Sequence, residues 1–188
     1  MIFTVSHLFA AFGLASASGL NAYLPLLIVA LAARFTTLIT LNPPFDVLTS
    51  GWVIGALIVL LAIESIIDKI PAADTLNDVI QTFVRPAAGA ILFAASTNAI
   101  NLSPVIAVIL GLILAFGVHA TKATARPIIT ATTGGLGNAF VSAGEDIVAT
   151  GVSLVALIVP LLLALVAALI LIWLAWRAFF RRRAAVVR

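Results

Sequence analysis

Long apolar runs separated by short polar stretches dominate the chain. The runs cover residues 2–33, 52–63, 86–118 and 147–175, and none alternates apolar and polar residues with the period of two expected of a half-buried strand. A bilayer core of about 30 Å takes about 20 helical residues to cross, so these runs are suited to cross or deeply enter a membrane. Lipid requires every backbone polar group to bond internally, which leaves helices or a closed barrel, and the Leu- and Ala-rich runs favour helices.

Polar residues inside the first run predict a break. Residues 2–33 are too many for one ordinary crossing, and SGLNAYLP places Gly19, Asn21 and Pro25 close together. This pattern favours a broken helix or a tight hairpin of two short helices. Residues 36–50, TTLITLNPPFDVLTS, have the prolines and polar residues of an extramembrane loop.

Proline and glycine predict further boundaries. We expect a helix from about residue 52 to 70, then a short amphipathic helix over 74–84, with Arg85-Pro86 opening an apolar helix that loosens near STNAINLSP. The next helix is expected over 104 to about 121. The Gly- and Thr-rich stretch IITATTGGLGNAFVSAGED then predicts a re-entrant segment or half-helix. Pro160 divides the final run into two helices or kinks one.

These patterns together predict an all-α fold, a polytopic transmembrane helix bundle with broken or re-entrant helices, forming one integral membrane domain over residues 1–188. An internal repeat is also indicated, because SGLNAY at 18–23 resembles GLGNAF at 135–140, and STNAI at 96–100 is a third Asn-Ala element. Short similarities in apolar sequence also arise by chance, so the repeat stays an open alternative.

Composition supports an integral membrane protein and excludes several kinds of chemistry. The chain is 63% hydrophobic and 9% charged, with a mean hydropathy of +1.27. It has no cysteine, which excludes disulfides and thiolate metal sites.

Basic residues follow the last apolar run, together with an aromatic belt. Residues 177–188 form a basic tail, which by the positive-inside rule is expected in the cytoplasm. A lipid headgroup anchor explains the tail without nucleic acid, so no nucleic-acid partner is expected. The basic residues are Arg177, Arg181, Arg182, Arg183 and Arg188, and the aromatic residues are Trp173, Trp176, Phe179 and Phe180.

The acidic residues are concentrated in one stretch, ESIIDKIPAADTLND. It holds four of the seven Asp and Glu residues of the chain. An unpaired charge at the bilayer centre costs at least about 2.5 kcal/mol, and intramembrane ionisable residues usually mark a pathway. We therefore identify candidate ion-coupling residues, Glu64, Asp68, Asp74, Asp78, Glu145 and Asp146, and candidate counter-charges or anion ligands, Arg85, Lys122 and Arg126.

Helical spacing predicts how these charges meet. Glu64 and Asp68 are four residues apart and share one helix face, and a second face carries Lys122 and Arg126, which we expect opposite the acids. Asp78 and Arg85 would share a face in a continuous helix. The alternative is that some of these charges cap helices or extend to lipid headgroups. Amide side chains at the expected helix breaks are candidate site-lining residues: Asn21, Asn98 and Asn138.

No catalytic constellation is apparent, so we expect neither an enzyme nor a cofactor. His7 and His119 lie far apart in sequence, and no serine has a nucleophile-elbow pattern. His119 is expected to serve in helix packing or proton relay. The acids and amides offer oxygen ligands for a hard cation, but no compact loop holds them together, so the metal stays undetermined.

Three polar elements resemble a known family. They are Gly19 to Pro25, ESIIDKIPAADTLNDVIQTFVRPAAGA and KATARPIITATTGGLGNAFVSAGED, and the resemblance extends over nearly the whole chain. The family consists of small bacterial membrane proteins filed as a domain of unknown function. The resemblance implies a multi-helix protein of the bacterial inner membrane, and it implies no substrate or catalytic residue.

The leading functional hypothesis is a small transporter or channel with a charged intramembrane cavity, which moves a cation or couples to protons. Glu64 and Asp68 would be the coupling carboxylates, and their pKa values would depend on nearby Lys122 and Arg126. One alternative is a carrier or flippase for an anionic phosphate or lipid headgroup, which Arg85, Lys122 and Arg126 would bind. Another is a non-transporting scaffold. The expected partners are the bilayer and a small ion or molecule, and a homodimer is left open.

Overall fold

The protein is all-helical over the residues that the structure describes. This computed structural model describes the backbone of residues 2–68 and 71–186, while the side chains of residues 2–3, 71–76, 99 and many positions from 160 onward fall outside the description. The elements are α1 (Ile2–Leu20), α2 (Tyr23–Phe35), η1 (Phe45–Thr49), α3 (Gly51–Ile67), α4 (Pro71–Thr97), η2 (Asn98–Ile100), α5 (Pro104–Thr133) and α6 (Leu136–Val186). The predicted all-α membrane bundle is confirmed.

The expected break in the first apolar run is confirmed between α1 and α2. The side-chain Oδ1 of Asn21 accepts hydrogen bonds from the backbone N–H groups of Tyr23 and Leu24, at 2.9 and 3.0 Å. It thereby satisfies two of the donors that the start of a helix leaves unpaired. Pro25 lies in the first turn of α2, where its missing N–H costs no intrahelical bond.

The connection from α2 to α3 follows the predicted loop. Residues 36–50 contain only the short η1 helix, and Ser50 caps α3 by accepting a hydrogen bond from the Val53 N–H at 3.3 Å. α3 ends at Ile67, slightly before the predicted end at 70, which lies outside the described residues.

Two predicted helix boundaries are wrong, both at prolines. α4 continues from Pro71 to Thr97 with Pro86 inside it, and α5 continues past residue 121 to Thr133 with Pro127 inside it. Packing against neighbouring helices can compensate for the backbone bond that a proline removes within a membrane protein. The α5 threonines also bond back to carbonyls of the preceding turn, as Thr130 does to Arg126 at 3.0 Å.

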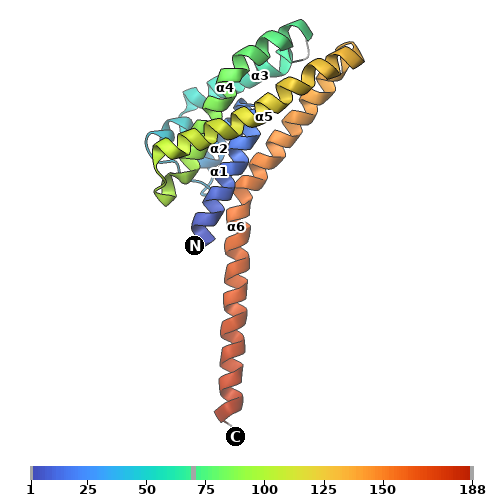
Figure 1. Ribbon diagram of the computed structural model, residues 1–188. Coiled ribbons are helices and arrows are strands. Elements are labelled where there is room, and N and C mark those ends of the chain that lie inside the picture. Colours follow the sequence, from blue (N-terminus) through green and yellow to red (C-terminus); the bar gives the residue numbers. More distant parts are fainter. Residues whose placement is uncertain (1, 69–70, 187–188) are drawn as a thin grey trace.

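The Gly-rich stretch after Pro127 is therefore a helix, a tight turn and a second helix. Gly134 and Gly135 form the turn with φ values of 61° and 87°, in the left-handed region that glycine enters without steric cost. α6 then runs as one helix past position 160, and Figure 1 shows that it bends and leaves the other helices toward the C-terminus.

α1 lies at the centre of the arrangement. It packs against α4, α5 and α6, while α4 and α5 form the most extensive helix pair and α2 and α3 cover one side (Figure 1). α4 and α5 approach so closely that a Cβ on Gly89 would lie 2.5 Å from the Cβ of Ala115. Small residues at such crossings are typical of helix packing in membranes, where van der Waals contact drives association.

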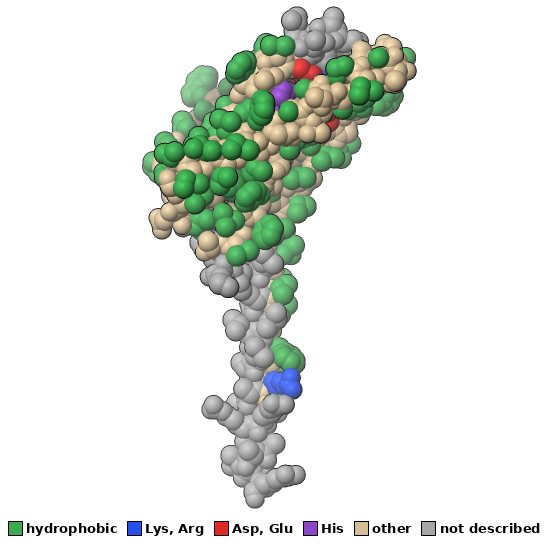
Figure 2. Space-filling model, viewed as in Figure 1, with side chains coloured by type: hydrophobic (Ala, Val, Ile, Leu, Met, Phe, Trp, Pro, Cys, Tyr) green, Lys and Arg blue, Asp and Glu red, His purple; other side chains and the backbone are tan. Residues whose placement is uncertain are grey.

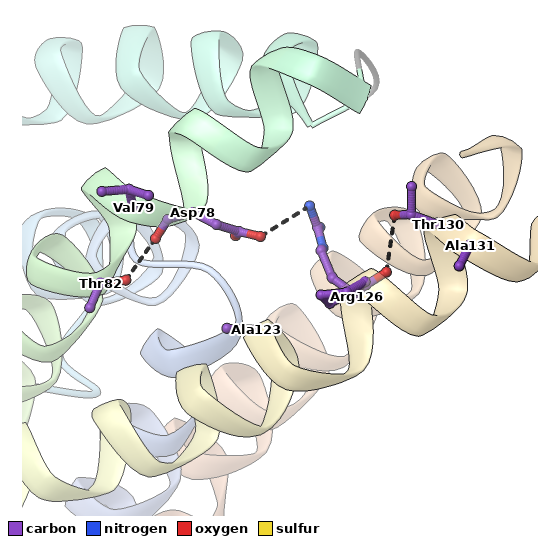
Figure 3. A pocket seen from close by; sticks show the side chains of 8 residues that line it. Asp78, Val79, Thr82, Ala123, Arg126, Thr130 and Ala131 are labelled. Carbon is purple, nitrogen blue, oxygen red and sulfur yellow. Dashed lines mark hydrogen bonds and ion pairs between the residues drawn. The ribbon is translucent and has the colours of Figure 1, made fainter. Parts of the chain in front are cut away.

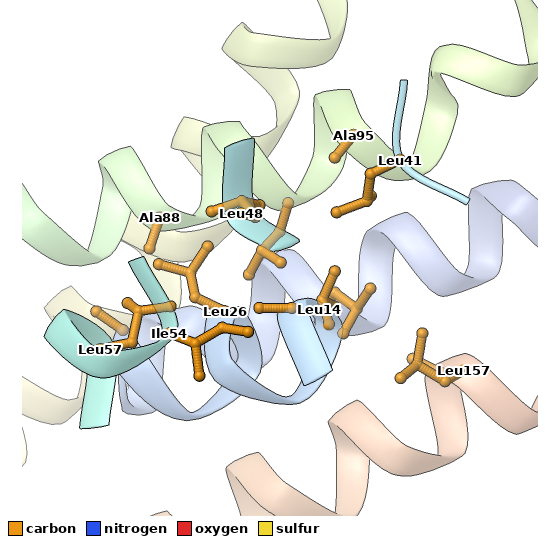
Figure 4. Close-up of a cluster of buried hydrophobic side chains, with 14 residues drawn as sticks. Leu14, Leu26, Leu41, Leu48, Ile54, Leu57, Ala88, Ala95 and Leu157 are labelled. Carbon is orange, nitrogen blue, oxygen red and sulfur yellow. The ribbon is translucent and has the colours of Figure 1, made fainter. Parts of the chain in front are cut away.

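The apolar core joins α1 and α2 to the helices on either side. Leu14, Leu26 and Val29 pack with Ile54 of α3 and Leu92 of α4 (Figure 4). The surface is also apolar: Figure 2 shows hydrophobic side chains spread over the visible face of the helical bundle. Among the residues that the structure describes, three helical segments are long and apolar enough to cross a membrane, namely Asn77–Thr97, Pro104–Thr133 and Leu136–Val159. This is the surface of a membrane protein.

Candidate functional site

A cluster of charged side chains lies buried between α3, α4, α5 and α6, near the C-terminal end of α1. Figure 2 shows acidic and histidine side chains in the surface near this end of the bundle, within an otherwise apolar face. We call this set the charged cluster. Its members are Glu64, Asp68, Asp78, Arg85, His119, Lys122, Arg126, Glu145 and Asp146.

Arg85 is the most deeply buried member, with 0% of its surface exposed. Its Nη2 donates to Oε1 of Glu64 at 3.0 Å, and its Nη1 lies 3.8 Å from Oδ1 of Asp78. Arg85 Nη1 also lies 3.0 Å from Nδ1 of His119. Because a guanidinium only donates, His119 must accept at Nδ1, and its protonated Nε2 faces the hydroxyl of Thr82 at 3.0 Å.

Lys122 and Arg126, one turn apart on α5, join the cluster to α6. Lys122 Nζ pairs with Oε2 of Glu145 at 2.7 Å, and Arg126 Nη2 reaches the same oxygen at 3.2 Å. Lys122 also donates to the carbonyl of Leu20 at 3.3 Å, one of the carbonyls that the end of α1 leaves unpaired. Arg126 lies 3.7 Å from Asp68 and 3.8 Å from Asp78.

Asp68 has a complete set of polar contacts. Its Oδ1 accepts a hydrogen bond from the Asn77 amide at 2.8 Å, and its Oδ2 accepts one from the Ser142 hydroxyl at 2.9 Å. These two bonds connect the end of α3 to α4 and α6. Glu64 differs, because its Oε2 is buried and has no hydrogen-bond partner in the described part of the chain.

The predicted pairing of the charges is partly confirmed. Arg126 does face Asp68, as the helical spacing indicated, but Glu64 pairs with Arg85 rather than with Lys122. Asp78 and Arg85 share a face and lie 3.8 Å apart, as expected for a continuous helix, because α4 continues through Pro86. Asp74 lies outside the side chains that the structure describes.

The three predicted site-lining amides have different surroundings. Asn21 donates to Oδ1 of Asp146 at 2.9 Å and therefore belongs to the charged cluster. Asn138 hydrogen-bonds Thr130 across the turn between α5 and α6, at 3.0–3.1 Å. Asn98 lies in η2, next to the end of α4 where His7 contacts the Ser96 carbonyl, so it is far along α1 from the cluster.

Several polar members of the site were missed from sequence. Thr82, Asn77 and Ser142 were not selected, although each contacts a cluster residue. Helical spacing could have indicated Thr82, since residues 78, 82 and 85 share one face of α4. The contacts of Asn77 and Ser142 with Asp68 join different helices, which spacing within one helix does not reveal.

Two pockets approach the cluster from different sides. The first, of about 570 Å³, lies between α4 and α5 and is lined by Asp78, Thr82, Arg126 and Thr130 (Figure 3). The second, of about 420 Å³, lies between α2, α3 and α6 and is lined by Ser65, Asp146 and Thr150 among apolar residues. Each pocket therefore reaches a carboxylate of the cluster.

Comparison with known proteins identifies a family across almost the whole length. The family model matches residues 8–181. The chain belongs to the family described as a domain of unknown function, DUF4126. No curated protein and no solved structure is significantly similar to it. The DUF4126 match confirms the resemblance inferred from the three polar elements.

The chemistry available in this DUF4126 chain follows from its charges. Five described carboxylates face three described bases, and each base forms an ion pair with at least one carboxylate. Within the described residues, no group of three or more His, Asp or Glu is arranged to hold a metal ion. The hard-cation hypothesis also included Asp74, whose side chain lies outside them.

Proposed function

We propose that the protein is a small membrane transporter that moves a cation, or couples transport to protons, through the charged cluster. The observation that carries this proposal is the excess of carboxylates over bases among the described side chains of a buried, largely paired network. A charge left unpaired inside a membrane protein is costly, so an acidic excess is favourable where a cation or proton occupies the site during the cycle.

The pockets support a route through the protein. Asp78 lines the pocket between α4 and α5 and forms ion pairs with both Arg85 and Arg126, each at 3.8 Å. Asp146 lines the pocket on the side of α2 and α3. Between them lie the buried pairs of Arg85 with Glu64 and of Arg126 with Glu145. We infer that ions or protons pass between these two carboxylates by rearrangement of the pairs.

The anion-carrier alternative has less support. Arg85 and Lys122 are buried and bond to Glu64 and Glu145, so an incoming phosphate would have to displace a carboxylate from its partner. The scaffold alternative explains the pairs but gives no account of the Oε2 of Glu64, which has no hydrogen-bond partner among the described residues. We further propose a bacterial inner-membrane location with residues 177–188 in the cytoplasm, because the positive-inside rule favours it.

The test is flux into proteoliposomes that contain the purified protein. Interior pH would be followed under an imposed pH gradient, and uptake of Na⁺, K⁺, Mg²⁺ and phosphate would be measured with and without that gradient. We expect saturable cation or proton flux that Glu64→Gln and Asp78→Asn each abolish. Asp46→Asn is the matched control, because Asp46 is exposed in η1, away from the cluster, and should transport as the unaltered protein does.

Folding must be kept separate from transport in this experiment. Each variant would first be shown to elute as the unaltered protein does in size-exclusion chromatography. Flux in Glu64→Gln equal to that of Asp46→Asn would refute the role of the cluster. Phosphate flux without any cation or proton flux would favour the anion carrier, and absence of all flux would favour the scaffold.

A further inference from the structure

The pocket between α2, α3 and α6 has a composition that suits a particular kind of ligand. Its lining is largely apolar, from Leu24, Leu61, Ile147 and Gly151, and its polar groups are Ser65, Asp146 and Thr150. Asp146 and Thr150 are four residues apart on α6, and Leu61 and Ser65 are four apart on α3, so each helix presents one face to the pocket. We call it the Asp146 pocket.

Asp146 differs from the other carboxylates of the charged cluster in its hydrogen-bond and ion-pair partners. Its Oδ1 accepts a hydrogen bond from Asn21 at 2.9 Å, which fixes the orientation of the carboxylate. Glu64, Asp68, Asp78 and Glu145 each form an ion pair with Arg or Lys, whereas no ion pair joins Asp146 to a base in the described part of the chain. An oriented carboxylate without a basic partner is suited to receive a cation from outside.

The two hydroxyls of the pocket are also available to a ligand. Several other helical Ser and Thr side chains bond back to carbonyls of the preceding turn, as Thr82 does to Asp78 at 2.8 Å and Ser153 does to Ala149 at 2.6 Å. Ser65 and Thr150 make no such bond, and neither has another hydrogen-bond partner among the described residues. Their donor and acceptor capacity therefore faces the pocket.

We propose that the Asp146 pocket binds a primary ammonium group that carries an apolar body. A primary ammonium has three N–H donors, and the pocket offers three acceptors in Asp146, Ser65 and Thr150. The apolar body would pack against Leu24, Leu61 and Ile147. A bare divalent cation fits less well, because Ca²⁺ takes about 6–8 oxygen ligands and Mg²⁺ keeps near-ideal octahedral geometry.

The position of the pocket admits two sources of such a ligand. Ile147 is 73% exposed on the apolar surface that a membrane would cover, so the opening lies on the lipid-facing side of α6. Two sources can supply the ammonium group at this opening: a soluble alkylamine and the headgroup of an aminolipid. Both present the same charge and the same donors, and experiment can separate them.

This inference extends the proposed function by naming a substrate class. The binding of an ammonium group does not depend on the proposed function, whereas the claim that the bound ammonium is transported rests on it. Binding and transport can therefore fail separately. Loss of flux in Glu64→Gln with ammonium binding retained would support both proposals. Binding without flux in the unaltered protein would leave the ammonium site standing and remove the transporter.

The test is calorimetric titration of the purified full chain with n-hexylammonium, in nanodiscs of phosphatidylglycerol alone. We expect saturable binding that hexanoate and 1-hexanol do not reproduce, because neither brings a positive charge to Asp146. Asp146→Asn should weaken binding about tenfold or more, as expected for loss of a charge-assisted hydrogen bond. Ser65→Ala and Thr150→Val should each weaken it to a lesser extent.

Controls separate the site from general membrane partitioning. Asp46→Asn, which removes an exposed acid in η1, should bind n-hexylammonium as the unaltered protein does. Equal affinity for 1-hexanol, or unchanged binding in Asp146→Asn, would overturn the proposal. Unchanged binding in both hydroxyl variants would do so as well, and these variants cover the case in which Asp146→Asn does not fold.

Adding phosphatidylethanolamine to the nanodiscs identifies the source of the ligand. If the aminolipid weakens n-hexylammonium binding in the unaltered protein, the pocket receives the lipid headgroup. If binding is unchanged, the ligand is a soluble amine. Either outcome is compatible with recognition of a primary ammonium.

Discussion

Replacement of Arg85 by Met is the sharpest test of the buried charged cluster. Arg85 has no exposed surface, and its Nη2 bonds Oε1 of Glu64, which is itself 1% exposed, at 3.0 Å. The substitution removes the guanidinium and leaves Glu64 buried without an ion-pair partner among the described residues. Asp78 would keep its ion pair with Arg126, so the loss falls mainly on Glu64.

The expected magnitude follows from this geometry. Unit charges about 4 Å apart attract by about 4 kcal/mol at an effective dielectric constant near 20, and the desolvation of both groups offsets part of this attraction. Removing one partner of a buried ion pair costs about 3–5 kcal/mol, because the remaining charge stays desolvated. We therefore expect Arg85→Met to lower the free energy of unfolding by about 3–5 kcal/mol.

The assay is equilibrium unfolding in mixed detergent micelles, followed by circular dichroism. Arg34→Met is the matched control, because Arg34 is exposed and its Nη1 donates to the Thr49 carbonyl at 2.8 Å. We expect a loss of no more than about 1 kcal/mol from that exposed contact. The double variant Arg85→Met with Glu64→Leu should recover a large part of the loss, since an apolar pair can replace a buried ion pair. A loss in Arg85→Met no greater than in Arg34→Met would refute the buried pairing.

Two further predictions test the helix packing that positions the cluster. Gly111→Ala should destabilise the protein by about 1–3 kcal/mol in the same assay, because the new Cβ would clash with the Gly89 carbonyl. Gly117→Ala, on the same helix, is the control: no atom lies within 4 Å of the position of its new Cβ, so it should not destabilise the protein. Equal effects of the two would contradict the close α4–α5 contact. The pair Gly13→Cys with Ala156→Cys should form a disulfide on oxidation, because a Cβ on Gly13 would lie 3.0 Å from that of Ala156 and the chain has no other cysteine. A slight separation of α1 and α6 then brings the two Cβ atoms to the roughly 3.5–4.5 Å that a disulfide requires. Peptide mass analysis would detect the disulfide. The control pair is Gly13→Cys with Val59→Cys, and an equal yield of disulfide from the control would argue against the contact between α1 and α6.

The helical class and the break at Asn21 could be predicted from sequence because they depend on local patterns. Apolar runs without a period of two require helices in lipid, and the Asn21 side chain bonds backbone groups only two and three residues away. Whether a helix continues through Pro86 and Pro127 depends on tertiary packing, which a single sequence does not reveal. In both cases proline was given too much weight, because its lost hydrogen bond can be compensated by neighbours.

The sequence predicted which residues form the charged cluster better than it predicted which acid pairs with which base. Helix spacing identified Glu64 with Asp68 and Lys122 with Arg126, and all four are in the cluster. Which acid meets which base depends on the relative rotation and depth of the helices, which spacing within one helix does not determine. The pairing of Glu64 with Arg85 needed the geometry of α3 against α4.

The partners of each carboxylate separate structural roles from functional ones. Asp68 has both oxygens bonded by neutral donors and joins α3 to α4 and α6, which is the arrangement of a residue that holds helices together. Asp146 is oriented by a neutral amide and faces a pocket with two unbonded hydroxyls. The first role predicts effects on stability and the second predicts effects on ligand binding. The acids that the sequence groups together as unusual are therefore of at least two kinds, and among the described ones Asp78 and Asp146 line the pockets, where they are placed to meet a ligand.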